Sequence, residues 1–175
     1  AFLAGLAKLE KLALWNEDFN DFEDIEKALM TSINMPLHNL SLRQIKNPFQ
    51  SNENLMEFLG RFSLTLEELD MGKFTQALPE SAYEIIFNQF HRLKTLRVIL
   101  ESAPSTSQFY HRLRVNPSVT KLIVDDVKAI EKQALFGMLS KLPNLDTLII
   151  NTDSVNQEIL LFIATNSTNI KTLAV

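Results

Sequence analysis

The sequence predicts an α/β solenoid in which short parallel strands line one curved sheet and helices lie outside it. A skeleton of leucine, two free residues, leucine, one free residue and an aliphatic residue recurs along the chain. Its seven copies begin at Leu9, Leu37, Leu66, Leu93, Val119, Leu145 and Ile170, 25–29 residues apart. A constant period of this length is typical of repeat proteins. Segments with the apolar spacing of a helix separate the copies.

Each copy alternates apolar and free residues, the pattern of a short strand with one face buried. Because a helical segment follows each strand, neighbouring strands must run parallel. Units of this size and order stack into one sheet with the helices on its outside.

Apolar residues in the intervening segments recur at helical spacing. The predicted buried faces are Phe22, Ile25, Leu29 and Ile33; Leu55, Phe58, Leu59 and Phe62; Tyr83, Ile86, Phe87 and Phe90; Leu135, Met138, Leu139 and Leu142; and Ile159, Phe162 and Ile163. The segment 102–117 holds only Phe109, Tyr110 and Leu113, which predicts a single short helix.

Two helix starts match the capping box, in which two side chains satisfy each other's free backbone N–H groups. These are Ser81 with Glu84 and Ser154 with Gln157. They predict helices that begin directly after each serine.

The amino-acid composition excludes several classes of protein. A chain of 175 residues forms one domain, residues 1–175, and its formal charge of −4 leaves no basic excess for direct contact with nucleic acid. It has no cysteine, hence no disulfide and no thiolate metal site, and no stretch long and apolar enough to span a membrane. The chain starts without Met inside an apolar segment and ends on a strand, so we expect a fragment of a longer protein.

The LxxLxL skeleton with one helix per copy resembles the leucine-rich repeat, over essentially the whole chain. The period is similar to that of the helix-bearing intracellular classes, such as ribonuclease-inhibitor-like and F-box leucine-rich-repeat proteins. The resemblance implies a cytoplasmic or nuclear protein. The family places Asn or Cys three residues after the third aliphatic position. This chain departs from the family there, with Glu17, Ile45, Phe74, Glu101, Val127 and Asp153.

No catalytic, cofactor or metal site is predicted. His38, His91 and His111 lack metal-ligand spacing, and the sequence has no nucleophile elbow, Walker motif or dinucleotide fingerprint. The pair Asp125–Asp126 is predicted to be a solvated strand end. We therefore expect a protein without enzymatic activity.

The third, fifth and seventh positions of each copy should face outward on the inner curve of the sheet. The predicted partner-binding residues there are Trp15, Arg43, Asp70, Arg97, Ile99, Ile123, Asp125 and Ile149. Trp15 would lie exposed near Arg43, and the three isoleucines would form an apolar stripe flanked by Arg97 and Asp125. Exposed apolar surface marks interaction sites, although β-branched residues also simply suit strands and Trp15 could fold over the N-terminal edge.

The predicted function is recognition of a protein partner through the concave face. The resemblance makes its most concrete form the substrate-recognition region of an F-box-type ubiquitin-ligase subunit, with the ligase scaffold contacted by regions outside this chain. Two alternatives stay open: the repeat region of an intracellular immune receptor or another adaptor, and that of a nuclear RNA-associated factor.

Overall fold

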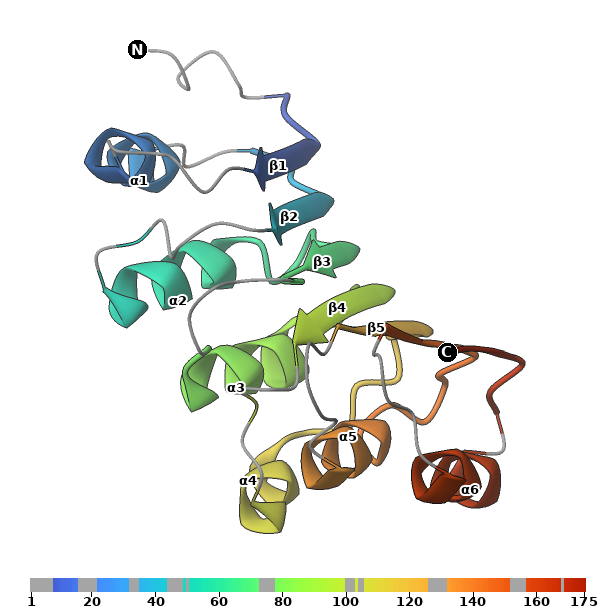
Figure 1. Cartoon of the computed structure of the whole chain (residues 1–175). Helices are drawn as coiled ribbons and strands as arrows, with labels where there is room; N and C mark the ends of the chain where they lie inside the picture. Colours follow the sequence, from blue (N-terminus) through green and yellow to red (C-terminus); the bar gives the residue numbers. More distant parts are fainter. Residues whose placement is uncertain are drawn as a thin grey trace.

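The computed structural model describes residues 8–15, 22–31, 35–43, 49, 51–72, 78–99, 103, 106–125, 132–151, 157–167 and 169–175. In these residues strands and helices alternate along the chain, from β1 to β7. Figure 1 shows the strands side by side with the helices on one side of them. The predicted α/β class is confirmed.

One sheet contains all the described strands. They are β1 (Lys11–Trp15), β2 (Asn39–Arg43), β3 (Glu68–Asp70), β4 (Thr95–Ile99), β5 (Lys121–Asp125), β6 (Thr147–Asn151) and β7 (Thr172–Ala174). Their order in the sheet is their order in the sequence, and every neighbouring pair is parallel. The predicted parallel arrangement is therefore confirmed.

Equivalent positions of the sequence skeleton lie opposite one another in the sheet. The third positions align as Lys11, Asn39, Glu68, Thr95, Lys121, Thr147 and Thr172. The same two backbone hydrogen bonds occur at every step: the N–H groups of the second and third positions both donate to the preceding second-position carbonyl. The donors are His38 and Asn39, Glu67 and Glu68, Lys94 and Thr95, Thr120 and Lys121, Asp146 and Thr147, and Lys171 and Thr172.

Alternate residues of each strand point to opposite faces of the sheet. On one face the leucines of the skeleton are buried, as with Leu40 and Leu42 at 1% and 0% exposure. Side chains on the other face keep partial exposure in β2, β4 and most of β5 and β6. We call this other side the open face. Its members are Lys11, Ala13, Asn39, Ser41, Arg43, Glu68, Asp70, Thr95, Arg97, Ile99, Lys121, Ile123, Asp125, Thr147, Ile149, Asn151, Thr172 and Ala174.

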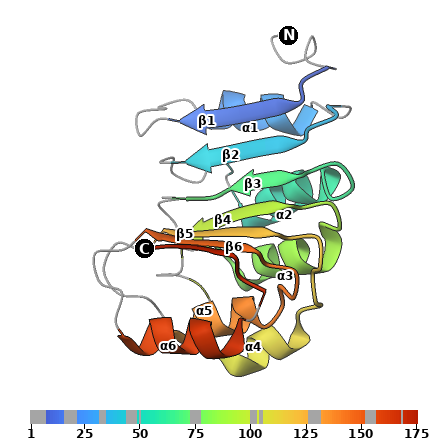
Figure 2. The same cartoon turned by 90° about the vertical axis from the view of Figure 1, so that its right-hand side faces the viewer.

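The helices cover the buried face of the sheet. They are α1 (Phe22–Thr31), α2 (Asn52–Arg61), α3 (Glu80–Gln89), α4 (Ser107–Arg112), α5 (Lys132–Leu139) and α6 (Gln157–Asn166). In Figure 2, α1 to α3 lie behind the strands and α4 to α6 lie below the last strands, so none crosses the open face. Among the described helices, none has the length and apolarity needed to traverse a bilayer.

Predicted helix faces form the core against the sheet. The buried members are Leu29, Leu55, Phe58, Leu59, Phe62, Tyr83, Ile86, Phe87, Phe90, Phe109, Tyr110, Leu113, Leu135, Met138, Leu142, Ile159 and Ile163. Leu139 is partly buried against them, and Phe162 stacks on Phe136 with ring centroids 3.4 Å apart. Ile33 and the side chains of Phe22 and Ile25 lie outside the described part of the chain.

Helix starts agree with the sequence in part. The single short helix predicted in 102–117 is confirmed as α4. The capping box at Ser81 is wrong: α3 begins at Glu80, two residues before the predicted start, with Pro79 as its N-cap. Proline fixes the extended backbone that an N-cap needs but offers no side-chain acceptor. The box at Ser154 lies outside the described residues.

Asparagine side chains link successive turns of the chain just before the strands. The amide nitrogen of Asn144 donates to the Pro117 carbonyl at 2.9 Å, and that of Asn169 donates to the Pro143 carbonyl at 2.7 Å. Buried Asn116 donates to the Phe90 carbonyl at 3.1 Å, at the end of α3. Side-chain amides therefore connect neighbouring turns of the chain just before the strands.

The strand register predicts which residues of β4 contribute most to the free energy of unfolding. Leu96, 0% exposed in the centre of the sheet, and Thr95, its neighbour on the open face, test this. Leu96→Ala should lower the free energy of unfolding by about 2–5 kcal/mol, because it leaves a cavity under the helices. Thr95→Ala should change it by about 0.5 kcal/mol or less. Urea denaturation of both variants measures the difference, and equal losses would contradict the assignment of the two faces.

Candidate binding surface

The open face brings seven of the eight predicted partner-binding residues onto one surface. Arg43, Ile99 and Asp125 occupy the seventh positions of their strands. Asp70, Arg97, Ile123 and Ile149 occupy the fifth positions and are in register from β3 to β6. The backbone of Trp15 pairs with Arg43, but its side chain lies outside the described part of the structure.

An ion pair between Arg97 and Asp125 is the strongest polar contact of this surface. Arg97 donates from Nε to Asp125 Oδ2 at 2.6 Å and from Nη2 to Oδ1 at 2.9 Å. This bidentate arrangement matches the planar guanidinium to the carboxylate. The resulting contact is stronger than a single hydrogen bond between neutral groups. Asn151 on the next strand donates to the same carboxylate at 2.7 Å. Three neighbouring strands are thereby joined on the open face.

Asp125 was predicted to be a solvated strand end, and this prediction is wrong. The residue is only 5% exposed. The sequence position alone places a carboxylate where the strand ends. It does not show that Arg97, 28 positions earlier, reaches diagonally across from β4 to cover it. Asp126, the other half of the pair, lies outside the described residues.

Asp70 continues the ionic contacts toward β2. Its carboxylate accepts a hydrogen bond from the backbone N–H of Gly72 at 2.9 Å. Arg97 Nε lies 3.9 Å from it on one side and Arg43 Nε lies 3.7 Å from it on the other. We call Arg43, Asp70, Arg97, Asp125 and Asn151 the charged cluster. Its two arginines and two aspartates cancel, so the cluster is neutral as a whole.

The pKa values of the two aspartates of the charged cluster are shifted in opposite directions. Burial alone would raise the pKa of Asp125, but hydrogen bonds from Arg97 and Asn151, with the positive charge of the two arginines, lower it below the ordinary value. For Asp70, burial dominates and raises the pKa, which the Gly72 hydrogen bond and the more distant arginines only partly offset. Asp125 is therefore the securely ionised member of the two.

Gly72 makes room for the ion pair. A Cβ atom at this position would lie 2.4 Å from Asp125 Oδ2 and 2.8 Å from Arg97 Nε. Both distances are too short for any real side chain, so only glycine lets the two groups meet there. Gly72 and Asn151 are the two members of this site that the sequence does not single out. The available signal is that both occupy seventh positions, and glycine is scarce in the chain.

Ile123 and Ile149 form an apolar pair beside the charged cluster. They lie opposite each other on β5 and β6, and both keep partial exposure. Ile99 lies in the adjacent row, opposite Asp125, instead of in line with the other two. The apolar surface of the three isoleucines is thus a pair with a third residue set diagonally from it.

Polar side chains border the apolar pair on β4 and in the row toward the strand ends, and Ala174 lies opposite Ile149 on β7. Arg97 flanks the pair on β4, and the next row toward the strand ends holds Asp125 and Asn151. Because these three groups already bond to one another, they form a fixed rim. An apolar centre inside a polar rim is the usual anatomy of a protein interface.

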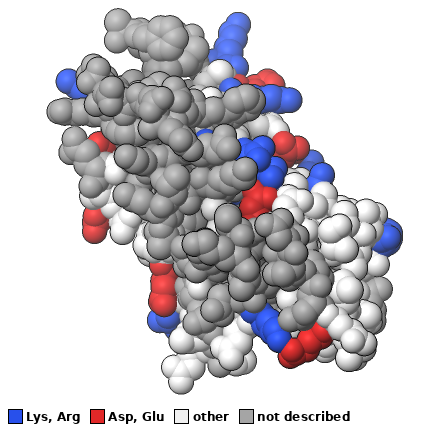
Figure 3. All heavy atoms as spheres, viewed as in Figure 1, with Lys and Arg blue, Asp and Glu red and all other residues white. Residues whose placement is uncertain are grey.

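Charges of both signs are interspersed on the visible surface. In Figure 3, described lysine and arginine side chains lie beside aspartate and glutamate in several places, and no extended area of one sign is seen on this face. A nucleic-acid backbone is bound through clustered cations. The described surface in this view offers no such cluster.

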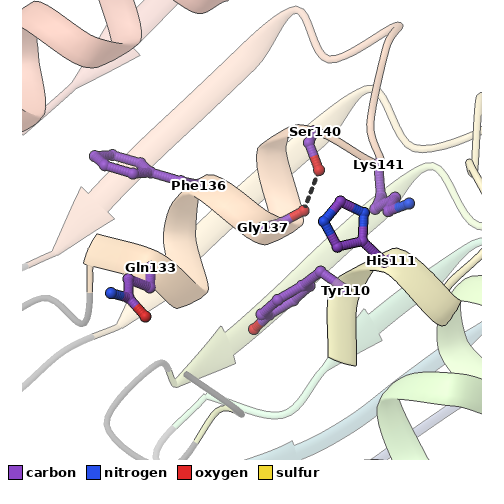
Figure 4. A pocket seen from close by; sticks show the side chains of 7 residues that line it. All are labelled: Tyr110, His111, Gln133, Phe136, Gly137, Ser140 and Lys141. Carbon is purple, nitrogen blue, oxygen red and sulfur yellow. Dashed lines mark hydrogen bonds between the residues drawn. The ribbon is translucent and has the colours of Figure 1, made fainter. Parts of the chain in front are cut away.

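A separate hollow lies on the helix side, between α4 and α5 (Figure 4). It measures about 420 Å³ and includes His111 and Lys141 on its border. The ring of Tyr110 occupies the space of a Cβ at Gly137, which would come within 2.2 Å of it. Burial raises the pKa of Tyr110, so its phenol stays protonated. None of the predicted binding residues lines the hollow.

No protein-family model matches this chain, and no curated protein matches it in sequence. Within the described residues, no group of three or more His, Cys, Asp or Glu side chains is arranged to hold a metal ion. The chemistry of the open face is therefore the basis on which a function is assigned.

Gly72 and Gly60 provide a matched pair of substitutions. Gly72→Ala should lower the free energy of unfolding by about 1–3 kcal/mol, because the new methyl group displaces the Arg97–Asp125 pair. Gly60 lies in α2 with nothing within 4 Å of an added Cβ, so Gly60→Ala should be neutral or stabilising by up to about 1 kcal/mol. Urea denaturation measures both. A neutral Gly72→Ala would show that the ion pair does not depend on this space.

The opposite pKa shifts of Asp125 and Asp70 predict that their contributions to stability depend on pH in opposite ways. Ionised Asp125 stabilises the fold above its ordinary pKa of 3.8, and this contribution is lost as the pH falls through its lowered folded pKa. Asp125→Asn should therefore cost about 2 kcal/mol near neutral pH, and the gap to the wild type should close below about pH 3.8. Urea denaturation across this pH range measures the gap.

Asp70 supplies the control for this experiment. Its folded pKa lies above 3.8, so the wild type should gain stability relative to Asp70→Asn as the pH falls through that raised pKa. As the pH falls, the stability of Asp125→Asn should thus approach that of the wild type, whereas the stability of Asp70→Asn should fall below it. Parallel stability curves for the wild type and both variants would refute the roles given to the two carboxylates.

Proposed function

We propose that the chain is a leucine-rich-repeat domain that recognises a protein partner through the open face of its sheet. The observation that carries this proposal is the apolar pair Ile123–Ile149 bordered by polar side chains already bonded to one another. Such a surface needs little reordering on binding, and reordering is a main cost of association. The resemblance to leucine-rich repeats implies that this face is the concave one.

The partner is bound and not chemically altered by this domain. Arg97 and the buried carboxylate of Asp125 neutralise each other in a fixed geometry. A catalytic base or nucleophile needs a reactive atom that is free to meet substrate. The proposed activity is therefore binding without turnover.

The most concrete form of the proposal is the substrate-recognition region of an F-box-type ubiquitin-ligase subunit, in the cytoplasm or nucleus. It rests on the resemblance of the LxxLxL skeleton and its period to that family. The ligase scaffold would bind regions outside this chain. The repeat region of an intracellular immune receptor or another adaptor would use the open face in the same way.

A nuclear RNA-associated factor is the second candidate class. It would act through protein contacts, because the net charge of −4 and the interspersed charges of the visible surface do not suit a phosphate backbone. Salt-dependent binding of RNA by the purified protein would reverse this preference.

Replacing both isoleucines by aspartate tests the proposal. Ile123→Asp/Ile149→Asp should abolish partner binding and leave the fold intact, since both side chains lie on the open face. Affinity purification with mass spectrometry, on the full-length protein with and without the two substitutions, measures binding in cells. Circular dichroism and the melting temperature check the fold.

A matched control places the same charges on the helix side. Val115→Asp/Leu161→Asp replaces two residues that are 55% and 65% exposed, away from the open face. It should retain every partner that the isoleucine variant loses. Recovery of ubiquitin-ligase scaffold subunits with all three proteins would support the F-box form, and their absence from all three would favour another adaptor. Identical partners for all three would refute recognition through the open face.

A further inference from the structure

The net charge of the open face differs from that of the whole chain. The described open face carries four cations, Lys11, Arg43, Arg97 and Lys121, and three carboxylates, Glu68, Asp70 and Asp125. Its net charge is therefore +1, on a chain whose formal charge is −4. The surface proposed for binding is thus the more basic part of an acidic protein.

All three carboxylates of the open face are already engaged. Glu68 accepts a hydrogen bond from Asn39. Asp70 and Asp125 are held by the contacts of the charged cluster. The carboxylates of this face therefore already accept hydrogen bonds from within the protein. A basic partner would find few free carboxylates to bind.

Lys121 is the charged group beside the apolar pair for which the described residues provide no counterion. It lies on the open face two residues before Ile123 and opposite Thr147. In the described part of the chain it makes no ion pair. Asp146, which precedes Thr147, instead accepts a hydrogen bond from the Thr147 hydroxyl at 2.9 Å.

A partner seated on the isoleucines would remove water from Lys121. An ammonium group that loses water without gaining a counterion is strongly penalised, and a partner cation at this point would add repulsion. A carboxylate of the partner would remove both costs. Unpaired polar groups and like charges are also the means by which an interface rejects wrong partners.

Resting on the proposed function, we infer that the open face recognises an acidic protein segment that places an apolar side chain on Ile123 and Ile149 and a carboxylate on Lys121. Alternate side chains of a strand lie about 7 Å apart, and Lys121 and Ile123 are such alternate residues. An extended segment with Asp or Glu two positions from an aliphatic or aromatic residue matches this spacing. Arg43, which touches Asp70 only at 3.7 Å, offers a second cation for a longer acidic segment.

Selection from a displayed library of short random peptides tests this inference. The library is panned on the immobilised wild type after depletion on Ile123→Asp/Ile149→Asp, so that retained peptides depend on the apolar pair. They should be enriched in Asp or Glu two positions from an apolar residue. Their affinity should fall as the salt concentration rises, because an exposed ion pair is screened.

Charge variants of the protein then locate the contact. Lys121→Glu should weaken the selected peptides about tenfold, and Lys121→Arg should retain most of the affinity. Lys141→Glu makes the same change of charge on the helix side, at the border of the hollow between α4 and α5, and should have no effect. Isothermal titration calorimetry with synthetic peptides measures all three.

The outcomes separate this inference from the proposed function. Peptides that depend on the isoleucines but are neutral or basic, or that bind Lys121→Glu as well as Lys141→Glu, overturn the acidic partner and leave recognition through the open face standing. Recovery of no isoleucine-dependent peptide overturns recognition of a linear segment. The cellular purification with the isoleucine variant still decides whether the open face binds a partner at all.

Discussion

In-register pairing of parallel strands is the constraint on which the other features depend. Because side chains alternate between the two faces, a slip of one residue would move every skeleton leucine out of the core. The paired backbone donors at each step hold the second-position carbonyls in line from β1 to β7. This alignment places the leucines under the helices. It also brings residues from distant parts of the sequence into continuous rows on the open face.

The charged cluster shows how such rows acquire specific chemistry. Arg97 and Asp125 are not register partners; they meet diagonally, in space that Gly72 leaves empty. Asp125 is buried in this pair, so the loss of Arg97 would leave a buried carboxylate poorly compensated. Its neutrality also means that it contributes shape and rigidity to the proposed interface more than net attraction. Attraction would come from the cations outside the cluster that lack a full counterion, Lys121 above all.

The helix layer is less regular than the sheet, and its irregularities have local causes. Prolines flank the segment of α4, which forms six residues of helix. Buried Asn116 donates to the carbonyls of Ile86 and Phe90 at the end of α3 and so links α3 to the turn before β5. Tyr110 of this short helix packs against Gly137 of α5 and lines the hollow between the two helices. Packing between units thus absorbs variation in helix length without disturbing the register of the strands.

The sequence by itself determined the α/β class, the parallel order, the register of the strands and the short α4. These features follow from apolar periodicity, which is local and survives any choice of side-chain conformation. It also placed Arg43, Asp70, Arg97, Ile123 and Ile149 on one face, because alternation along a strand is geometric. Only the tertiary structure decided that Asp125 is buried and that Asn151 and Gly72 complete its environment. The physical reason is that these outcomes depend on contacts between side chains of neighbouring strands, 26–28 residues apart in the sequence. The residue pattern within one strand does not specify how far such side chains reach or how deeply they are buried.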